Sequence, residues 1–195
     1  MKLYIMRHGE TDGNRGNRLQ GRADIPLNEN GIRQAKVAGE KLLKKNLIFD
    51  AVDSSPLQRA MDTAVLVSGR RREQLRTDER LLEIDLGPYD GADLKQSFPV
   101  IRQLMENRPP EGVEKISSLE ARISDFVRDL TSSPCEQNVL IVTHGVAMRG
   151  IIRELTGREN VWGINIGNCE IYEADIGSHG CRSCRSFQRL EDVEF

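Results

Sequence analysis

The sequence has no long apolar run, few cysteines and no excess of charge of either sign. No stretch approaches the roughly 20 apolar residues that a membrane-spanning helix needs. The run before Arg7 is too short for the apolar region of a signal peptide. Four cysteines are too few to cross-link a chain of 195 residues. These absences predict a reduced, cytoplasmic protein without a membrane segment.

The balance of charge argues against two classes of partner. Lys and Arg number 28 against 30 Asp and Glu, so the formal net charge of −2 points neither to nucleic acid nor to a membrane surface. The content of 38% hydrophobic and 30% charged residues is that of an ordinary globular protein. Because no repeat, low-complexity segment or linker divides the chain, we expect a single domain over residues 1–195.

Short apolar runs alternate with amphipathic helical patterns along the chain. Strands are predicted over residues 3–6, 49–54, 138–143 and 169–175, with 177–188 as an edge partner. Helices are predicted over residues 31–45, 55–68, 117–131 and 145–155. Residues 87–91 read as an irregular loop, and 92–112 as helical segments broken at Pro99 and Pro109-Pro110. The alternation predicts an α/β fold, a three-layer α/β/α sandwich with a mainly parallel central sheet.

Two of the three histidines directly follow predicted strands. His8 comes after the first strand and His144 after residues 138–143. In parallel sheets the ligand site lies beyond the carboxyl ends of the strands. Taken alone, His8 is as easily a surface residue as a functional one, and its position between Arg7 and Gly9 predicts an accessible ring. The shared position of the two histidines favours a functional site at this edge of the sheet.

Arg59 lies where a helix dipole disfavours a cation. Ser55 as N-cap and Pro56 at the first helical position put Arg59 in the first turn of the predicted helix. A positive charge there is unfavourable by up to about 1 kcal/mol unless an anion shares the site. A neighbouring carboxylate would account for Arg59, but a bound phosphate accounts for it better.

Further polar groups surround this predicted anion site. The turn at His144-Gly145, before a helix, presents backbone N–H groups to an anion. Asn14 and Arg18 add donors from the first loop, whereas Glu83, taken by itself, reads as a solvated loop carboxylate.

Five sequence blocks resemble the histidine phosphatase superfamily, in the family's order. They are RHGETDGN (7–14), RLQGRADIPLNENGIRQA (18–35), SSPLQRAMDTA (54–64), LLEIDLGPYDG (81–91) and VTHGVAMRGII (142–152). This family includes the cofactor-dependent phosphoglycerate mutases, fructose-2,6-bisphosphatase and the α-ribazole phosphatases. The resemblance implies a phosphoglycerate mutase-like fold and a phosphohistidine intermediate.

The resemblance also implies roles for individual residues. His8 would be the nucleophile, with Arg7, Arg59 and His144 as a phosphate clamp and Glu83 as the proton donor. The substrate-binding positions would be Asn14, Gln20 and Gly21, together with Gly145 from the turn described above. Two departures from the family pattern stand out: Gly13 replaces a residue that is often tryptophan, and Tyr89-Asp90-Gly91 replaces aromatic–Glu–Gly.

These residues suffice for phosphoryl transfer without metal or cofactor. Neutral His8 attacks phosphorus, the arginines neutralise charge, and Glu83 protonates the leaving oxygen and then activates water. No Asp, Asn and His cluster of the two-metal type is evident. We therefore expect a metal-independent phosphomonoester hydrolase that acts on a small phosphorylated metabolite.

Two other functions compete with hydrolysis. A phosphoglycerate mutase is disfavoured because the 61 positions between Glu83 and His144 leave no room for the extended insert of known mutases. A non-catalytic phosphate-binding or interaction protein would have lost one of His8, Arg59, Glu83 or His144, and none is lost.

Three further features are open to more than one interpretation. His179, Cys181 and Cys184, with Cys169, resemble a small metal site but are interpreted as free thiols on an edge hairpin. Residues 92–112 are expected to cover the pocket, where Lys95, Arg102 or Arg108 would either meet a second anionic group or form a solvated helix face. The substrate class remains open among a sugar phosphate, α-ribazole phosphate and a nucleotide, and a homodimer is compatible with the sequence.

Overall fold

A six-stranded sheet forms the centre of the protein, as the computed structural model shows for residues 1–132, 137–177 and 184–190. Along the sheet the strands run in the order β3-β2-β4-β1-β5-β6. Their bounds are β1 (Lys2–Arg7), β2 (Ala51–Ser54), β3 (Arg76–Thr77), β4 (Asn138–Thr143), β5 (Ile171–Ile176) and β6 (Cys184–Arg189). The first four strands in this order pair in parallel, while β5 and β6 pair antiparallel. The predicted mainly parallel sheet is thus confirmed, with β6 as its edge.

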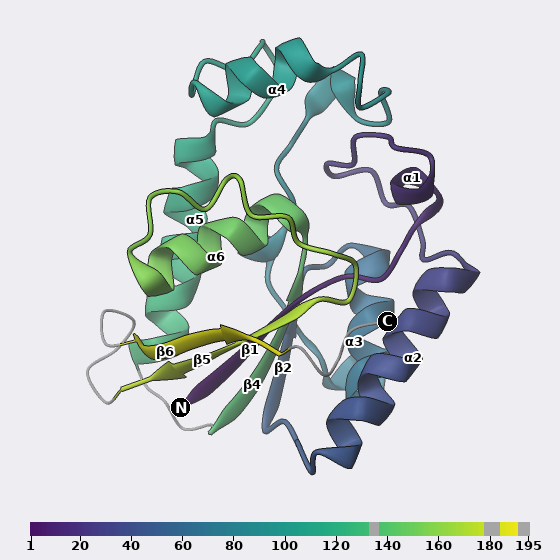
Figure 1. Ribbon diagram of the computed structural model, residues 1–195, viewed down its shortest axis with the longest axis vertical. Helices are drawn as coiled ribbons and strands as arrows, with labels where there is room; N and C mark the ends of the chain where they lie inside the picture. The colour runs from purple at the N-terminus through teal and green to yellow at the C-terminus, as the bar shows by residue number, and fades with distance from the viewer. Residues whose placement is uncertain (133–136, 178–183, 191–195) are drawn as a thin grey trace.

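Helices cover both faces of this sheet (Figure 1). The α-helices are α1 (Asp12–Arg15), α2 (Glu29–Lys44), α3 (Gln58–Ser68), α4 (Phe98–Met105), α5 (Ile116–Ser132) and α6 (Gly145–Thr156). Three short 3-10 helices, η1 (Arg72–Gln74), η2 (Glu79–Leu81) and η3 (Gly87–Tyr89), lie between α3 and α4. The predicted three-layer sandwich is confirmed.

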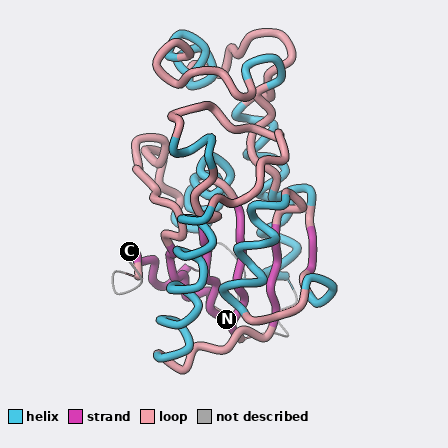
Figure 2. Tube along the Cα trace, turned by 90° about the vertical axis from the view of Figure 1, so that its right-hand side faces the viewer, coloured by secondary structure: helices cyan, strands magenta, loops and turns pink. Residues whose placement is uncertain are grey.

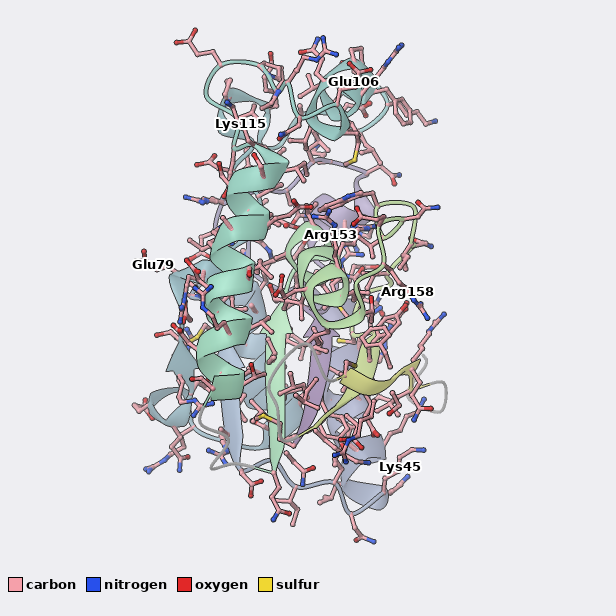
Figure 3. The ribbon with its side chains drawn as sticks, turned by 90° about the vertical axis from the view of Figure 1, so that its left-hand side faces the viewer. Lys45, Glu79, Glu106, Lys115, Arg153 and Arg158 are labelled. Atoms are coloured by element: carbon pink, nitrogen blue, oxygen red, sulfur yellow. The ribbon has the colours of Figure 1, made fainter. Side chains whose placement is uncertain are left out.

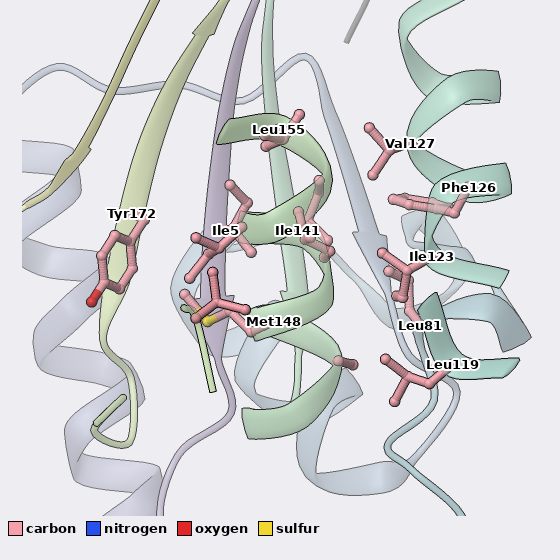
Figure 4. Packing of buried hydrophobic residues seen from close by; sticks show 14 of the residues in the cluster. Ile5, Leu81, Leu119, Ile123, Phe126, Val127, Ile141, Met148, Leu155 and Tyr172 are labelled. Atoms are coloured by element: carbon pink, nitrogen blue, oxygen red, sulfur yellow. The ribbon is translucent and has the colours of Figure 1, made fainter. Parts of the chain in front are cut away.

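Alternation of side chains along the buried strands separates two hydrophobic cores. Leu3 and Ile5 of β1 face α5 and α6, whereas Tyr4 and Met6 face α2 and α3. Figure 4 shows part of the first core, with residues of the strands, of α5 and of α6 packed together. Many charged side chains lie exposed on the outside of these layers, as Glu79 and Lys115 in Figure 3 illustrate. Across the described residues, no helix is long and apolar enough to span a membrane.

The register of the parallel strands places the ends of β1 and β4 side by side. Arg7 pairs with Thr143, and the N–H of His8 donates to the Thr143 carbonyl at 2.9 Å. The N–H of Ser55, just after β2, donates to the Val142 carbonyl at 3.0 Å. Loops and short helices gather beyond these strand ends (Figure 2). Residues far apart in the sequence therefore meet at the carboxyl edge, as predicted.

Local predictions fail where tertiary contacts or helix-end geometry decide the structure. α3 begins at Gln58 with Leu57 as its N-cap, so the predicted cap at Ser55 is wrong. Pro99 does not break a helix but lies in the first turn of α4, where its missing N–H has no intrahelical partner to lose. The loop predicted over 87–91 contains the 3-10 turn of η3.

Candidate active site

His8 is buried at the end of β1, with 3% of its surface exposed. The predicted accessible ring is therefore wrong. The loop after His8 packs closely against the start of α2, where a Cβ on Gly9 would lie 2.7 Å from the Gly31 carbonyl oxygen. Only glycine permits this close approach of the two backbones.

The tautomer of His8 follows from one hydrogen bond. Nδ1 lies 2.7 Å from the carbonyl oxygen of Gly9. A carbonyl oxygen only accepts, so Nδ1 carries the proton and the neutral ring keeps its lone pair on Nε2. Burial lowers the pKa of His8 well below its usual value near 6.5, and the charges of Arg7 and Arg59 lower it further. The ring is therefore neutral at physiological pH, in the form that a nucleophile needs.

Arg7 lies beside His8 and directs its guanidinium toward the same edge of the sheet. Its Nη1 donates to the Ile166 carbonyl at 2.6 Å. Its Nε is buried and has no hydrogen-bond partner among the described residues. Burial lowers the pKa of Arg7, and the Glu83 carboxylate opposes that shift. A buried donor without an acceptor costs about 1–3 kcal/mol, which an anionic ligand would offset.

Arg59 is fully buried in the first turn of α3. Its Nη1 and Nη2 each donate at 2.7 Å, to the carbonyls of Ala23 and Gly21 respectively. Asp90 fixes that loop, because its carboxylate accepts the N–H groups of Gly21 at 2.9 Å and Ala23 at 2.7 Å. The predicted position of Arg59 in the first turn of this helix is confirmed, and its partners in the protein are two carbonyls and a ring nitrogen of His144. Asp90, noted as a departure from the family pattern, holds the loop that orients Arg59.

His144 links Arg59 to the end of β2. Its Nδ1 accepts from Arg59 Nε at 3.2 Å, so Nε2 carries the proton and donates to Ser55 Oγ at 2.7 Å. The His144 and His8 rings are 5.2 Å apart between centroids and tilted by 60°. Burial lowers the pKa of His144 well below 6.5, with the Arg59 charge as the next cause. The Arg59 N–H thus fixes this tautomer, and Ser55, predicted as a helix cap, accepts from the other ring nitrogen.

Glu83 occupies the N-terminus of α6. Its Oε2 accepts the Val146 N–H at 3.0 Å, while its Oε1 accepts those of Ala147 at 3.0 Å and Ile84 at 2.9 Å. Glu83 thus occupies two of the N–H groups at the helix start that the sequence predicted for an anion, while the role of Gly145 stays a prediction. The reading of Glu83 as a solvated carboxylate is wrong, because its side chain is buried. Three backbone N–H donors therefore hold the Glu83 carboxyl group at the N-terminal end of this helix.

Arg149 is a component of the site that the sequence did not reveal. On α6, one turn after Gly145, its Nη1 donates to the Gly145 carbonyl at 2.9 Å, and its Nε and Nη2 donate to the Ile164 carbonyl at 3.0 and 2.7 Å. Burial lowers its pKa, and Glu83 opposes the shift. The helical spacing of four residues after Gly145 is the signal that could have indicated it.

Guanidinium groups are concentrated at this edge. Arg7 and Arg59 share one electrostatic environment with Arg149 and Glu83, and both histidines are neutral. Three guanidinium groups thus surround the single Glu83 carboxyl group, while Asp24, Asp90 and Glu170 act on Arg59 and Arg7 from further out. Such a concentration of guanidinium groups suits an anionic ligand such as a phosphomonoester.

Two side-chain amides line the loop after His8. Gln20 Oε1 accepts from the Thr11 hydroxyl at 2.9 Å, and its buried Nε2 has no partner among the described residues. Asn14 Oδ1 accepts from the Thr11 N–H at 3.2 Å. A Cβ on Gly13 would lie 2.4 Å from Gln20 Nε2, so the Gly13 departure makes room for the Gln20 amide.

Other predicted residues do not join this cluster. Lys95, Arg102 and Arg108 are exposed, and Arg102 pairs with Glu106 on α4. Within 1–132, 137–177 and 184–190, no group of three or more His, Cys, Asp or Glu could hold a metal ion. His179 and Cys181 lie outside the described residues, whereas Cys169 and Cys184 are free thiols.

Three comparisons relate this arrangement to known proteins. The family model of the histidine phosphatase superfamily (branch 1) matches residues 3–188. A protein of Hydrogenobacter thermophilus provisionally named phosphoserine phosphatase 2 is 34% identical over 181 residues, 88% of each chain. A variant of phosphoserine phosphatase from Entamoeba histolytica, solved in complex with phosphoserine, has a TM-score of 0.81 at 28% identity and covers 95% of each chain. A mycobacterial glucosyl-3-phosphoglycerate phosphatase in complex with VO3 has a TM-score of 0.79 at 30% identity over 96% of each chain.

Proposed function

The chain belongs to the histidine phosphatase superfamily, and we propose that its His8 takes up the phosphoryl group of a small phosphomonoester. The protein is a phosphatase of small phosphorylated metabolites. The hydrogen bond from His8 Nδ1 to Gly9 carries the residue assignment, because it leaves the Nε2 lone pair on a neutral ring beside buried arginines.

The first step transfers the phosphoryl group to His8. Nε2 attacks phosphorus as the ester P–O bond breaks, and the ring gains positive charge, which the Gly9 carbonyl stabilises through Nδ1–H. Arg7 and Arg59 contact the phosphate oxygens, and the Nε of Arg7 is one donor without an acceptor in the protein. His144 holds the Arg59 side chain through its Nδ1. Asn14, Gln20, Gly21 and Gly145 complete the proposed substrate-binding set.

Glu83 supplies the proton of the leaving oxygen in this proposal. Three N–H groups hold its carboxyl group in place beside the arginines. In the proposed first step Glu83 is protonated and acts as the general acid. The leaving alcohol takes this proton. In the second step Glu83 removes a proton from water, which attacks phosphorus as the P–N bond breaks.

We propose a carboxylate-bearing phosphomonoester of phosphoserine size as the substrate class. The relatives in the comparisons are named for phosphoserine and glucosyl-3-phosphoglycerate, both of which carry a carboxylate near the phosphate ester.

We further propose that residues 92–112 cover the pocket within one domain over 1–195. The N–H of Leu19 donates to Ala92 at 2.9 Å, and that of Leu94 donates to Asn17 at 2.9 Å, so the segment is joined to the loop that carries Gln20. The scarcity of cysteine supports a cytoplasmic location.

Labelled phosphate tests the residue assignment. The native enzyme, quenched during turnover of labelled phosphoserine, is expected to carry label that is stable in alkali and lost in acid, and His8→Ala is expected to carry none. Label that survives acid but not alkali would indicate an acyl phosphate and exclude His8. A panel of sugar phosphates, nucleotides and α-ribazole phosphate ranks the substrate classes.

A separate assay distinguishes hydrolysis from mutase activity. Given 3-phosphoglycerate with a trace of the 2,3-bisphosphate, the enzyme is expected to release phosphate from at least one monoester and to form little 2-phosphoglycerate. Rapid isomerisation without phosphate release would make mutase activity the better description.

A further inference from the structure

Alternate residues of the segment before β5 each contact a different part of the site. The Ile164 carbonyl accepts from Arg149, and the Ile166 carbonyl accepts from Arg7. Two residues later, Nδ2 of Asn168 donates at 3.1 Å both to the His8 carbonyl and to Asn14 Oδ1.

The Asn168 amide determines which way the Asn14 amide faces. Asn14 Oδ1 accepts from the Thr11 N–H at 3.2 Å and from Asn168 Nδ2 at 3.1 Å. The reverse orientation would place the Asn14 NH2 group against these two N–H donors. The Asn14 NH2 group is consequently the part of the amide left to meet a ligand.

Asn168 itself is anchored to the strand that carries His8. The N–H of Cys169 donates to the carbonyls of Arg7 and His8, at 3.1 and 3.3 Å, and Cys169 adopts a left-handed backbone with φ of 56°. The Arg7 N–H donates to the Glu170 carbonyl at 3.1 Å, and Glu170 Oε2 accepts the Gly167 N–H at 2.7 Å. The turn is thus tied to β1 on one side and closed on itself on the other.

We propose that Asn168 is a positioning residue for phosphoryl transfer, whose single NH2 group fixes the backbone of His8 and orients the amide of Asn14. The proposal rests on the nucleophilic role of His8. Asn168 acts through His8 and Asn14 and needs no contact with substrate.

The variant Asn168→Asp tests this geometry most directly. Aspartate has the same shape but presents only acceptors, so it would face the His8 carbonyl and Asn14 Oδ1 without a proton to share. Rapid-mix kinetics with p-nitrophenyl phosphate are expected to show phosphoenzyme formation slowed by at least about tenfold, with a smaller loss in Asn168→Ala. Asn160→Asp is the control, because Asn160 is exposed in the same loop, and its rate should equal that of the native enzyme.

A double variant separates positioning from general support of the fold. If Asn168 acts partly through Asn14, the loss in Asn14→Ala/Asn168→Ala will be smaller than the product of the two single losses. Losses that multiply, or Asn168→Asp and Asn168→Ala rates within about twofold of native, would overturn the proposal. Should Asn168→Asp fail to fold, the comparison of Asn168→Ala with the double variant decides. A native enzyme that forms no phosphohistidine would instead refute the nucleophile assignment itself.

Discussion

Replacing Glu83 by glutamine tests two consequences of one buried side chain. In the native protein, the carboxylate accepts Val146 N–H through Oε2 and two further N–H groups through Oε1. Glutamine can keep its oxygen at the Oε1 position, but its NH2 group then faces the N–H of Val146. One acceptor is lost and one buried donor is left unsatisfied, so Glu83→Gln does not preserve the local hydrogen bonding.

The stability cost of this change follows from the lost acceptor. A buried N–H without a partner costs about 1–3 kcal/mol. For a chain of this length, each kcal/mol lowers Tm by about 2–4 °C, so thermal unfolding should occur about 2–12 °C lower than in the native protein. Activity must therefore be measured well below the variant's Tm, with folding checked by circular dichroism.

The catalytic cost should depend on the leaving group. Alkyl phosphates leave as basic alkoxides and need a proton, so their rate should fall by about a hundredfold or more. The p-nitrophenolate ion is stable without a proton, so the first step with p-nitrophenyl phosphate should be nearly unchanged. Water activation then becomes slow, and a burst of nitrophenol with accumulating phosphoenzyme is expected.

Rapid-mix kinetics with both substrates provide the assay, and Asp85→Asn is the control. Asp85 lies two residues from Glu83, is partly exposed and pairs with Arg22, so this variant should not depend on the leaving group. Equal losses in the first step for both substrates would refute the proton-donor role. Glu83 would then act by holding α6, and Asp85, the nearest carboxylate in sequence, would be the next candidate to test as donor.

The remaining predictions concern charge. Because burial depresses the pKa of His8 and His144, these residues bind protons below pH 6.5 in the unfolded chain but not in the folded one. The free energy of unfolding should therefore decrease as the pH falls below 6.5, by up to about 1.4 kcal/mol per pH unit for each histidine. His8→Gln should make this dependence of stability on pH less steep. Excess EDTA should leave activity intact and vanadate should inhibit it, whereas a requirement for added magnesium would contradict charge neutralisation by arginines. Arg149→Met should raise KM for phosphoserine about tenfold or more, and an unchanged KM would remove Arg149 from the substrate site.

The positions of the two histidines could be predicted because strand ends are visible in a sequence. A buried run that stops at Arg7-His8 and another that stops at His144 must meet if their strands are parallel neighbours, and the register Arg7–Thr143 shows that they do. The blocks of the family pattern add Arg59 and Glu83. The type of a residue and its position at a predicted strand end were therefore enough to identify the two histidines as members of the site.

What the sequence did not predict depends on contacts with backbone atoms. His8 is buried, and the Gly9 backbone lies close to that of Gly31; residue type alone predicts neither the burial nor this packing. Glu83 fills the N-terminus of α6 across 62 residues of chain, so two N–H groups of the helix end predicted for a ligand are already occupied. Asn168 contacts the site from an irregular segment, where no periodic pattern marks which side chain points inward.

The pairing of β1 has a consequence for how the protein is made. This strand precedes the rest of the sheet in the chain, yet its neighbours are β4 and β5, more than 130 residues later. During synthesis its apolar side chains leave the ribosome long before either partner exists. Such distant pairing slows folding and prolongs the exposure of unpaired strand edges. A nascent chain stalled before β4 would hold every residue from His8 to Glu83 and still lack the two strands between which β1 lies, so such truncated products are the ones most prone to aggregate or to engage chaperones.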